Sequence, residues 1–162
     1  MQFAARMTAR PGVAKVMVLI TCDQLTNGYF YGDAITMLRE ELIKMHYINP
    51  TELKLKNKKS RNKILGFDKS SVYTAKNINT HSGDVTLRGR LKVPKDYLST
   101  LATESGGSVF SQSSFIQSSR DYKTAASIFG RRVAKTAISS NCQVSFWLEI
   151  TLFTFEFLVT DL

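Results

Sequence analysis

The sequence predicts an α+β fold, in which residues 1–162 form a single domain with an antiparallel sheet and helices packed on one face. Three observations lead to this class. Apolar residues alternate with period two in several segments, and two other segments show helical periodicity. The elements follow the order strand, helix, strand, strand, helix, strand, which is the ferredoxin-like βαββαβ order with an extra helix and a long bulged C-terminal strand.

The first third of the chain predicts a strand, a helix and a short second strand. Val13 to Cys22 is apolar on nearly both faces, which is typical of a strand in the middle of a sheet. The helix is expected from Asp33, a good N-cap, to Tyr47, because apolar residues recur every three or four positions. Thr51 to Lys56 alternates leucine with lysine, as a short edge strand does.

The middle of the chain predicts two antiparallel strands, at residues 71–78 and 84–93. In the second strand, Thr86, Arg88, Arg90 and Lys92 alternate with apolar residues and share one face. Gly89 lies on the apolar face, where a bulge or a close neighbour is expected. Pro94 ends the strand and opens a short helix to Glu104.

A serine-rich segment and a second long helix follow. Residues 105–119 hold seven serines and predict either a flexible loop or a weak edge strand. Residues 1–11 and 57–63 are also expected to be mobile. Asp121 caps a predicted helix to about Ser139, and Gly130 within it predicts a packing requirement, since glycine costs about 1 kcal/mol relative to alanine in a helix.

The most apolar stretch is Gln143 to Leu162, and the sequence suggests that the rest of the chain is organised around it. Its apolar residues fall on even positions up to Leu152 and on odd positions from Phe153. This change of face indicates a β-bulge, or a strand whose second half is buried in a second sheet or a partner chain. Such an apolar strand predicts a homo-oligomer formed through the sheet edge.

Composition predicts an intracellular, cytoplasmic protein with no membrane partner. The C-terminal stretch contains Glu149 and Glu156 and alternates, which is unlike a membrane-spanning helix. The N-terminal apolar run is short and is interrupted by Lys15, unlike a signal peptide. Cys22 and Cys142 lie far apart beside predicted strands, which indicates buried, reduced thiols.

The positive charge is concentrated in the middle of the chain. The formal net charge is +9; residues 51–100 hold 12 Lys/Arg against 4 Asp/Glu, whereas residues 1–50 hold 5 against 4 and residues 101–162 hold 5 against 5. A local surplus of this kind predicts a polyanionic partner. The alternative is an ordinary solvated surface.

The candidate binding residues are basic side chains for phosphates and aromatic side chains for base stacking. One basic segment places six cations in ten residues without an acid, and the other is the basic face of the strand at 84–93. The predicted backbone-binding residues are Lys54, Lys56, Lys58, Lys59, Arg61, Lys63, Arg88, Arg90 and Lys92. The predicted stacking residues are Tyr29, Phe30 and Tyr31, and a possible extension consists of Arg131, Arg132 and Lys135.

These features predict a non-catalytic protein that binds single-stranded nucleic acid, RNA ahead of DNA, with low sequence specificity and with no cofactor or metal. A second interpretation is a structural or assembly subunit of a larger particle that uses its C-terminal strand as the interface. A third is a metal-independent ribonuclease in which His81 acts with Lys76 or Tyr73. The other histidine, His46, falls on the predicted first helix.

Overall fold

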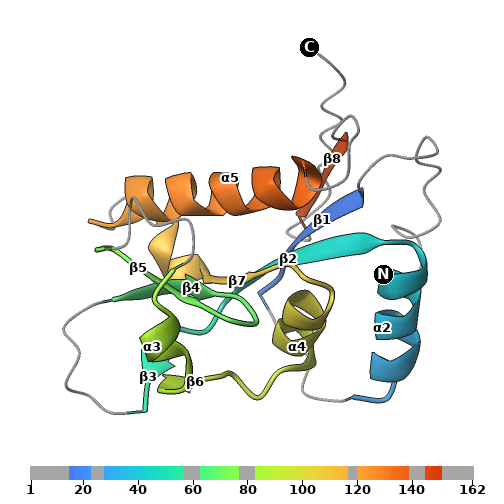
Figure 1. Ribbon diagram of the computed structural model, residues 1–162, viewed down its shortest axis with the longest axis horizontal. Helices are drawn as coiled ribbons and strands as arrows, with labels where there is room; N and C mark the ends of the chain where they lie inside the picture. Colours follow the sequence, from blue (N-terminus) through green and yellow to red (C-terminus); the bar gives the residue numbers. More distant parts are fainter. Residues whose placement is uncertain are drawn as a thin grey trace.

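The structure, a computed structural model, describes residues 15–22, 28–56, 63–76, 83–116, 120–138 and 145–150. The prediction of a domain that combines helices with strands is confirmed (Figure 1). The main sheet contains β1 (Lys15–Ile20), β2 (Ile43–Asn49), β4 (Ile64–Phe67), β5 (Val72–Thr74), β7 (Val109–Ser111) and β8 (Ser145–Ile150). A separate two-stranded ribbon contains β3 (Lys54–Leu55) and β6 (Leu91–Lys92). The helices are α2 (Tyr31–Glu40), α3 (Val85–Arg88), α4 (Tyr97–Glu104), α5 (Tyr122–Ile138) and the 3-10 turn η1 (Gln112–Ser114).

The strand order of the main sheet is β5-β4-β7-β2-β1-β8. Strands β7, β2, β1 and β8 pair in parallel, whereas β4 is antiparallel to both of its neighbours, β7 and β5. The expected antiparallel, ferredoxin-like sheet is therefore corrected to a mixed sheet with a parallel centre. Parallel neighbours need crossover connections, and segments containing α2, α4 and α5 provide them.

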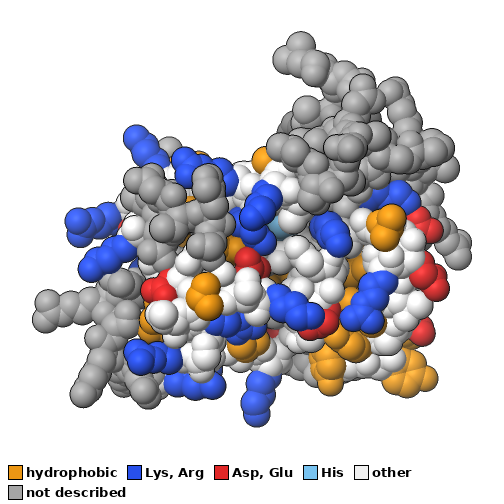
Figure 2. All heavy atoms as spheres, viewed as in Figure 1, with side chains coloured by type: hydrophobic (Ala, Val, Ile, Leu, Met, Phe, Trp, Pro, Cys, Tyr) orange, Lys and Arg blue, Asp and Glu red, His pale blue; other side chains and the backbone are white. Residues whose placement is uncertain are grey.

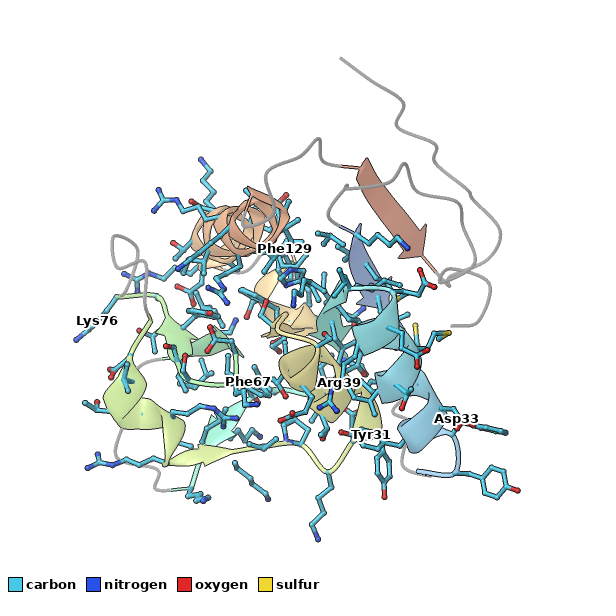
Figure 3. The ribbon with its side chains drawn as sticks, turned by 45° about the vertical axis from the view of Figure 1, so that its right-hand side comes forward. Tyr31, Asp33, Arg39, Phe67, Lys76 and Phe129 are labelled. Atoms are coloured by element: carbon cyan, nitrogen blue, oxygen red, sulfur yellow. The ribbon has the colours of Figure 1, made fainter. Side chains whose placement is uncertain are left out.

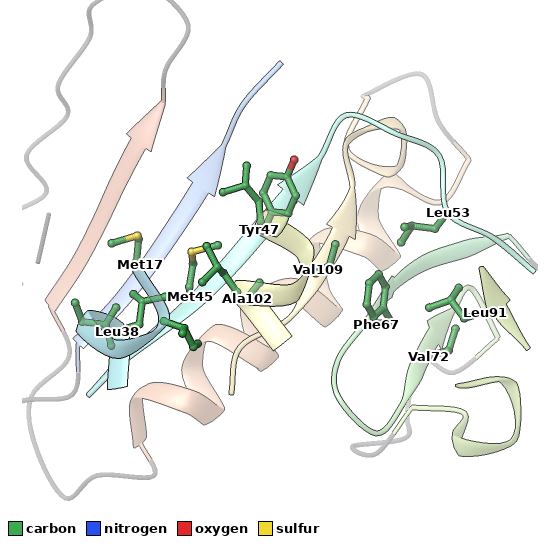
Figure 4. Close-up of a cluster of buried hydrophobic side chains, with 14 of the residues drawn as sticks. Met17, Leu38, Met45, Tyr47, Leu53, Phe67, Val72, Leu91, Ala102 and Val109 are labelled. Atoms are coloured by element: carbon green, nitrogen blue, oxygen red, sulfur yellow. The ribbon is translucent and has the colours of Figure 1, made fainter. Parts of the chain in front are cut away.

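Helices cover both faces of the sheet rather than one, which also corrects the prediction. In Figure 1, α5 lies above the sheet, and α2 and α4 lie below it. Met45 and Tyr47 face the α2 and α4 side and belong to the largest core cluster (Figure 4), whereas His46 between them bonds to α5. β1 follows the same alternation, since Met17 joins the largest cluster and Val16 packs with residues of α5. Its predicted central position, apolar on both faces, is confirmed.

The first helix is shorter than predicted because the chain changes from helix to strand near residue 42. α2 ends at Glu40, and Leu42 has a left-handed φ of 55°, which stops helical propagation. From Ile43 the chain is β2, so His46 lies on a strand and not on a helix. Asp33 is not the N-cap either, because the helix begins at Tyr31 and Asp33 lies in its first turn.

The predicted strand at residues 84–93 is replaced by one short helix and one short strand. The Asp84 carboxylate accepts the backbone N–H of Thr86 and so caps α3. Of the predicted pairing between the two strands, a single antiparallel bridge between Val72 and Asp84 is present. β5 pairs mainly with β4, a strand that the sequence interpretation did not include, and β6 pairs with β3. Gly89 ends α3 in a right-handed helical conformation, so no bulge is present there.

The serine-rich segment contains an interior strand, because β7 lies between β4 and β2. Phe110 is fully buried and stacks on Tyr73 with ring centroids 5.6 Å apart. Ser108 and Ser111 are also fully buried and make side-chain hydrogen bonds. A strand is therefore confirmed for Val109–Ser111, and its expected position at the edge of the sheet is wrong. In the following helix, a side chain at Gly130 would meet nothing within 4 Å, so the expected packing requirement is also absent.

The C-terminal strand is confirmed for the six residues of β8, which pairs in parallel with β1. Among the described strands, β1 is its only neighbour, and β8 lies at the end of the sheet. The change of face after Leu152 lies outside the described residues. Association through this edge stays a prediction.

The structure also bears on two expectations drawn from composition. Cys22, just after β1, is exposed, which corrects its predicted burial, and Cys142 lies outside the described residues. Within the described part of the chain, no helix is long and apolar enough to cross a membrane.

His46 connects the centre of the sheet to α5 through two side-chain hydrogen bonds. Its Nδ1 lies 2.7 Å from Ser108 Oγ, and its Nε2 lies 2.9 Å from Thr136 Oγ1. The Thr136 hydroxyl is within donating distance of the carbonyls of Arg132 and Val133, so it accepts from Nε2. Burial, followed by the positive charge of Arg132, lowers the pKa of His46 to about 4. The buried ring is therefore neutral at pH 7.

We predict that stability falls as the pH is lowered from about 6.5 to about 4, because the unfolded chain binds a proton at His46 in this range and the folded chain does not. The loss amounts to about 3 kcal/mol, and the contribution is fully present above pH 6.5. Urea unfolding of the protein and of His46→Gln at several pH values measures it. A variant with the same pH dependence as the unaltered protein would contradict this assignment.

Candidate functional site

The two predicted basic segments meet in the β3–β6 ribbon. Lys54 lies opposite Lys92 and Leu55 opposite Leu91, and the Lys56 backbone N–H donates to the Arg90 carbonyl at 2.7 Å. We call the side chains of Lys54, Lys56, Arg90 and Lys92 the basic ribbon; all four are exposed. Segments more than thirty residues apart in the sequence thus place their cations on one small surface.

The basic ribbon is attached to the domain by leucines. Leu53 and Leu91 are buried in the largest core cluster, and Leu55 packs against it (Figure 4). Like charges directly opposite each other in an antiparallel pair are destabilising, as Lys54 and Lys92 are here. Leucine burial therefore explains why the ribbon folds, and it does not explain why the solvent side carries lysines and arginine.

Three of the four acidic residues among residues 51–100 are occupied elsewhere, and the fourth, Glu52, pairs with one cation of the basic ribbon. Asp68 and Asp96 are buried, Asp84 caps α3, and Glu52 forms an exposed ion pair with Lys54 at 3.1 Å. Within the described ranges, Lys56, Arg90 and Lys92 form no ion pair. Figure 2 shows Lys and Arg side chains spread over this face, including its left and lower edges, with acidic side chains among them and others at the right. Within the described residues, Lys54 is the member of the basic ribbon that has an acidic partner.

Arg88 lies beside the basic ribbon but does not continue it as a stripe along a strand. It is the last residue of α3, its Nε donates to the Lys69 carbonyl at 3.3 Å, and its guanidinium lies 5.1 Å from the centroid of the Phe67 ring. The predicted face formed by Arg88, Arg90 and Lys92 is therefore corrected, since the three residues belong to a helix, a turn and a strand.

The other predicted lysines and arginines are not brought into the basic ribbon by the described structure. Lys58, Lys59 and Arg61 lie outside the described residues. Lys63 precedes β4, and its Nζ donates to the Ser113 carbonyl at 3.5 Å, next to the end of β7.

The possible extension on α5 is separated from the basic ribbon by the sheet, because α5 covers the opposite face (Figure 1). Arg131 and Lys135 are exposed there. Arg132 has a structural role: it pairs with Asp68 at 3.0 Å, and its guanidinium lies 5.7 Å from the centroid of the Tyr73 ring. We therefore exclude these three residues from the site.

Asp68 completes this internal contact. Burial alone would raise the pKa of Asp68, but hydrogen bonds from the Tyr73 hydroxyl and from the backbone N–H groups of Ser70 and Ser71, together with the charge of Arg132, lower it. Asp68 is thus held as a carboxylate, and its charge is used inside the domain.

The three consecutive aromatic residues divide into two groups. Tyr29 and Phe30 are 83% and 67% exposed, with ring centroids 4.9 Å apart and the ring planes nearly perpendicular. Tyr31 begins α2 and is partly buried, and its ring centroid lies 5.6 Å from that of Tyr97. Two of the three predicted stacking side chains are therefore presented to solvent, while the third fixes the start of the helix.

The exposed aromatics and one strand of the basic ribbon follow the carboxyl ends of neighbouring parallel strands. β1 leads to Tyr29 and α2, and β2 leads to β3, with which β6 pairs later in the chain. Since β1 and β2 are parallel neighbours, both connections leave the sheet at the carboxyl ends of its strands. Open parallel sheets bind ligands at these ends, at the point where the strand order reverses, which here lies between β1 and β8. The sequence interpretation missed this relationship because it assigned an antiparallel sheet.

The described residues do not assemble the catalytic group of the ribonuclease interpretation. Tyr73, one proposed partner of His81, is 2% exposed and donates its hydroxyl to Asp68. His81 itself lies outside the described residues, and His46 is fully buried. No group of three or more His, Cys, Asp or Glu side chains in the described part is placed to hold a metal ion.

No protein-family model, curated protein or solved structure matches this chain.

We predict that Lys92→Glu increases the free energy of unfolding by about 0.2–1 kcal/mol, because it converts the repulsion with Lys54 into a cross-strand attraction. Urea unfolding measures the change. Lys76→Glu, on the exposed turn after β5, is the control for a general reduction of positive charge. An equal gain in the control, or a loss of stability in Lys92→Glu, would contradict the prediction.

Proposed function

We propose that this protein binds single-stranded nucleic acid and holds the phosphate backbone on the basic ribbon. The observation that carries the proposal is the β3–β6 pairing, which places Lys54, Lys56, Arg90 and Lys92 on one exposed surface. Binding is non-catalytic and needs no cofactor. Phosphate contacts from lysine and arginine carry no sequence information, so the preference for particular sequences is low.

The charge distribution supports a polyanion over a single small anion. Residues two apart along a strand are about 6–7 Å apart, and residues directly opposite are about 5 Å apart, so the cations form an array. A chain of phosphates can neutralise several members of such an array at once, and it releases its own counterions when it does so. The proposed preference for RNA over DNA still rests on the sequence alone.

The test is a salt series with fluorescent single-stranded RNA, single-stranded DNA and duplex DNA. If all four cations of the basic ribbon contact phosphates, the log–log slope on a single strand is about −3. Arg90→Glu/Lys92→Glu is expected to weaken binding at least tenfold and to reduce the slope by about 1.4. Its control is Lys123→Glu/Lys135→Glu, which changes the net charge equally on the exposed side of α5.

Unchanged affinity in the folded Arg90→Glu/Lys92→Glu variant would refute the role of the basic ribbon. Equal losses in the two double variants would show that binding follows net charge and not this surface. Circular dichroism of both variants establishes that they are folded.

A further inference from the structure

Two exposed aromatic rings stand at the start of α2, and no structural role accounts for their exposure. Single exposed apolar residues are common on protein surfaces, but Tyr29 and Phe30 are adjacent, and Tyr97 beside them is 38% exposed. We call Tyr29 and Phe30 the aromatic platform. Large rings kept in water are typical of a surface that meets a flat apolar ligand.

The aromatic platform is held in place from both sides. After it, Tyr31 donates its backbone N–H to the Gly28 carbonyl at 3.0 Å and packs its ring on Tyr97. Before it, Gly28 lies so close to Tyr97 that a Cβ at this position would come within 2.4 Å of the ring. Figure 3 shows Tyr31 at the start of α2, with the neighbouring side chains reaching outward. The two exposed rings therefore project from a fixed turn.

The platform and the basic ribbon are joined by one short connection. β6 ends at Lys92 and α4 begins at Tyr97, so five residue steps separate them, and the two Cα atoms are at most about 18 Å apart. Lys95, halfway along this connection, is exposed. One further cation, Lys95, therefore lies in the chain between the basic ribbon and Tyr97, which supports the aromatic platform.

A negative charge near the aromatic platform indicates which part of a ligand the platform contacts. Asp33 is exposed in the first turn of α2, two residues after Tyr31 (Figure 3). A carboxylate there repels phosphates but not the uncharged faces of bases. The phosphate backbone of a ligand is therefore favoured at the basic ribbon, and its bases are favoured at the aromatic platform.

We infer that the aromatic platform of Tyr29 and Phe30 stacks unpaired bases of the same strand whose phosphates lie on the basic ribbon. This inference rests on the proposed function and specifies its ligand as a strand with accessible bases. A duplex does not satisfy it, since its bases are already stacked and paired. Every base has a π-face, so stacking adds affinity without selecting a sequence.

The experiment compares a single-stranded oligonucleotide with an abasic oligonucleotide of the same length, which carries the same phosphates without bases. Phe30→Ala and Tyr29→Ala are each expected to weaken binding of the first by about 5- to 150-fold and to leave the second unchanged. Tyr122→Ala, on an aromatic residue that is 37% exposed on α5, is the control and should affect neither. The salt slope should stay the same in all three variants, because the phosphate contacts remain.

Equal binding of the two oligonucleotides, or an equal loss for both in the aromatic variants, would overturn the platform. Neither result would bear on the proposed role of the basic ribbon. That role would be refuted separately if Arg90→Glu/Lys92→Glu bound the abasic oligonucleotide as tightly as the unaltered protein does.

Discussion

The parallel pairing of β1 with β2 is the constraint on which the candidate site depends. Parallel neighbours cannot be joined by a hairpin, so the chain leaves the carboxyl end of β1, returns through α2, and leaves the carboxyl end of β2 in its turn. Both departing segments therefore begin at one edge of the sheet. One carries the exposed aromatic residues, and the other carries β3, which forms the basic ribbon with β6.

The division of charge follows from the same architecture. Three of the four carboxylates among residues 51–100 cap helices or pair inside the domain: Asp96 caps α4, Asp84 caps α3, and Asp68 holds Arg132 of α5. The fourth, Glu52, pairs with Lys54 at the surface. These roles place the negative charge where the fold needs it and leave the cations of the ribbon in solvent. The opposed lysines Lys54 and Lys92 weaken the ribbon slightly, which is expected where charge serves binding rather than stability.

The sequence predicts those elements whose periodicity has a single interpretation. β1 is apolar on both faces, and α5 keeps a helical stripe over its length, and both are found where expected. β2 was missed because Met45 fits both the helical spacing from Leu38 and Leu42 and the alternation from Ile43 to Tyr47. The interior position of β7 is not predictable because its serines are typical of a loop or an edge strand until their buried hydrogen-bond partners are known.

The members of the candidate site were predictable from charge and aromatic content, but their arrangement was not, since it depends on a β3–β6 pairing between segments distant in sequence.

The most direct test follows backbone amide resonances by NMR while a single-stranded oligonucleotide is added. The account predicts changes concentrated at residues 28–31, 52–56 and 90–97, with α5 little affected. Changes concentrated on α5, with those three segments unaltered, would contradict it.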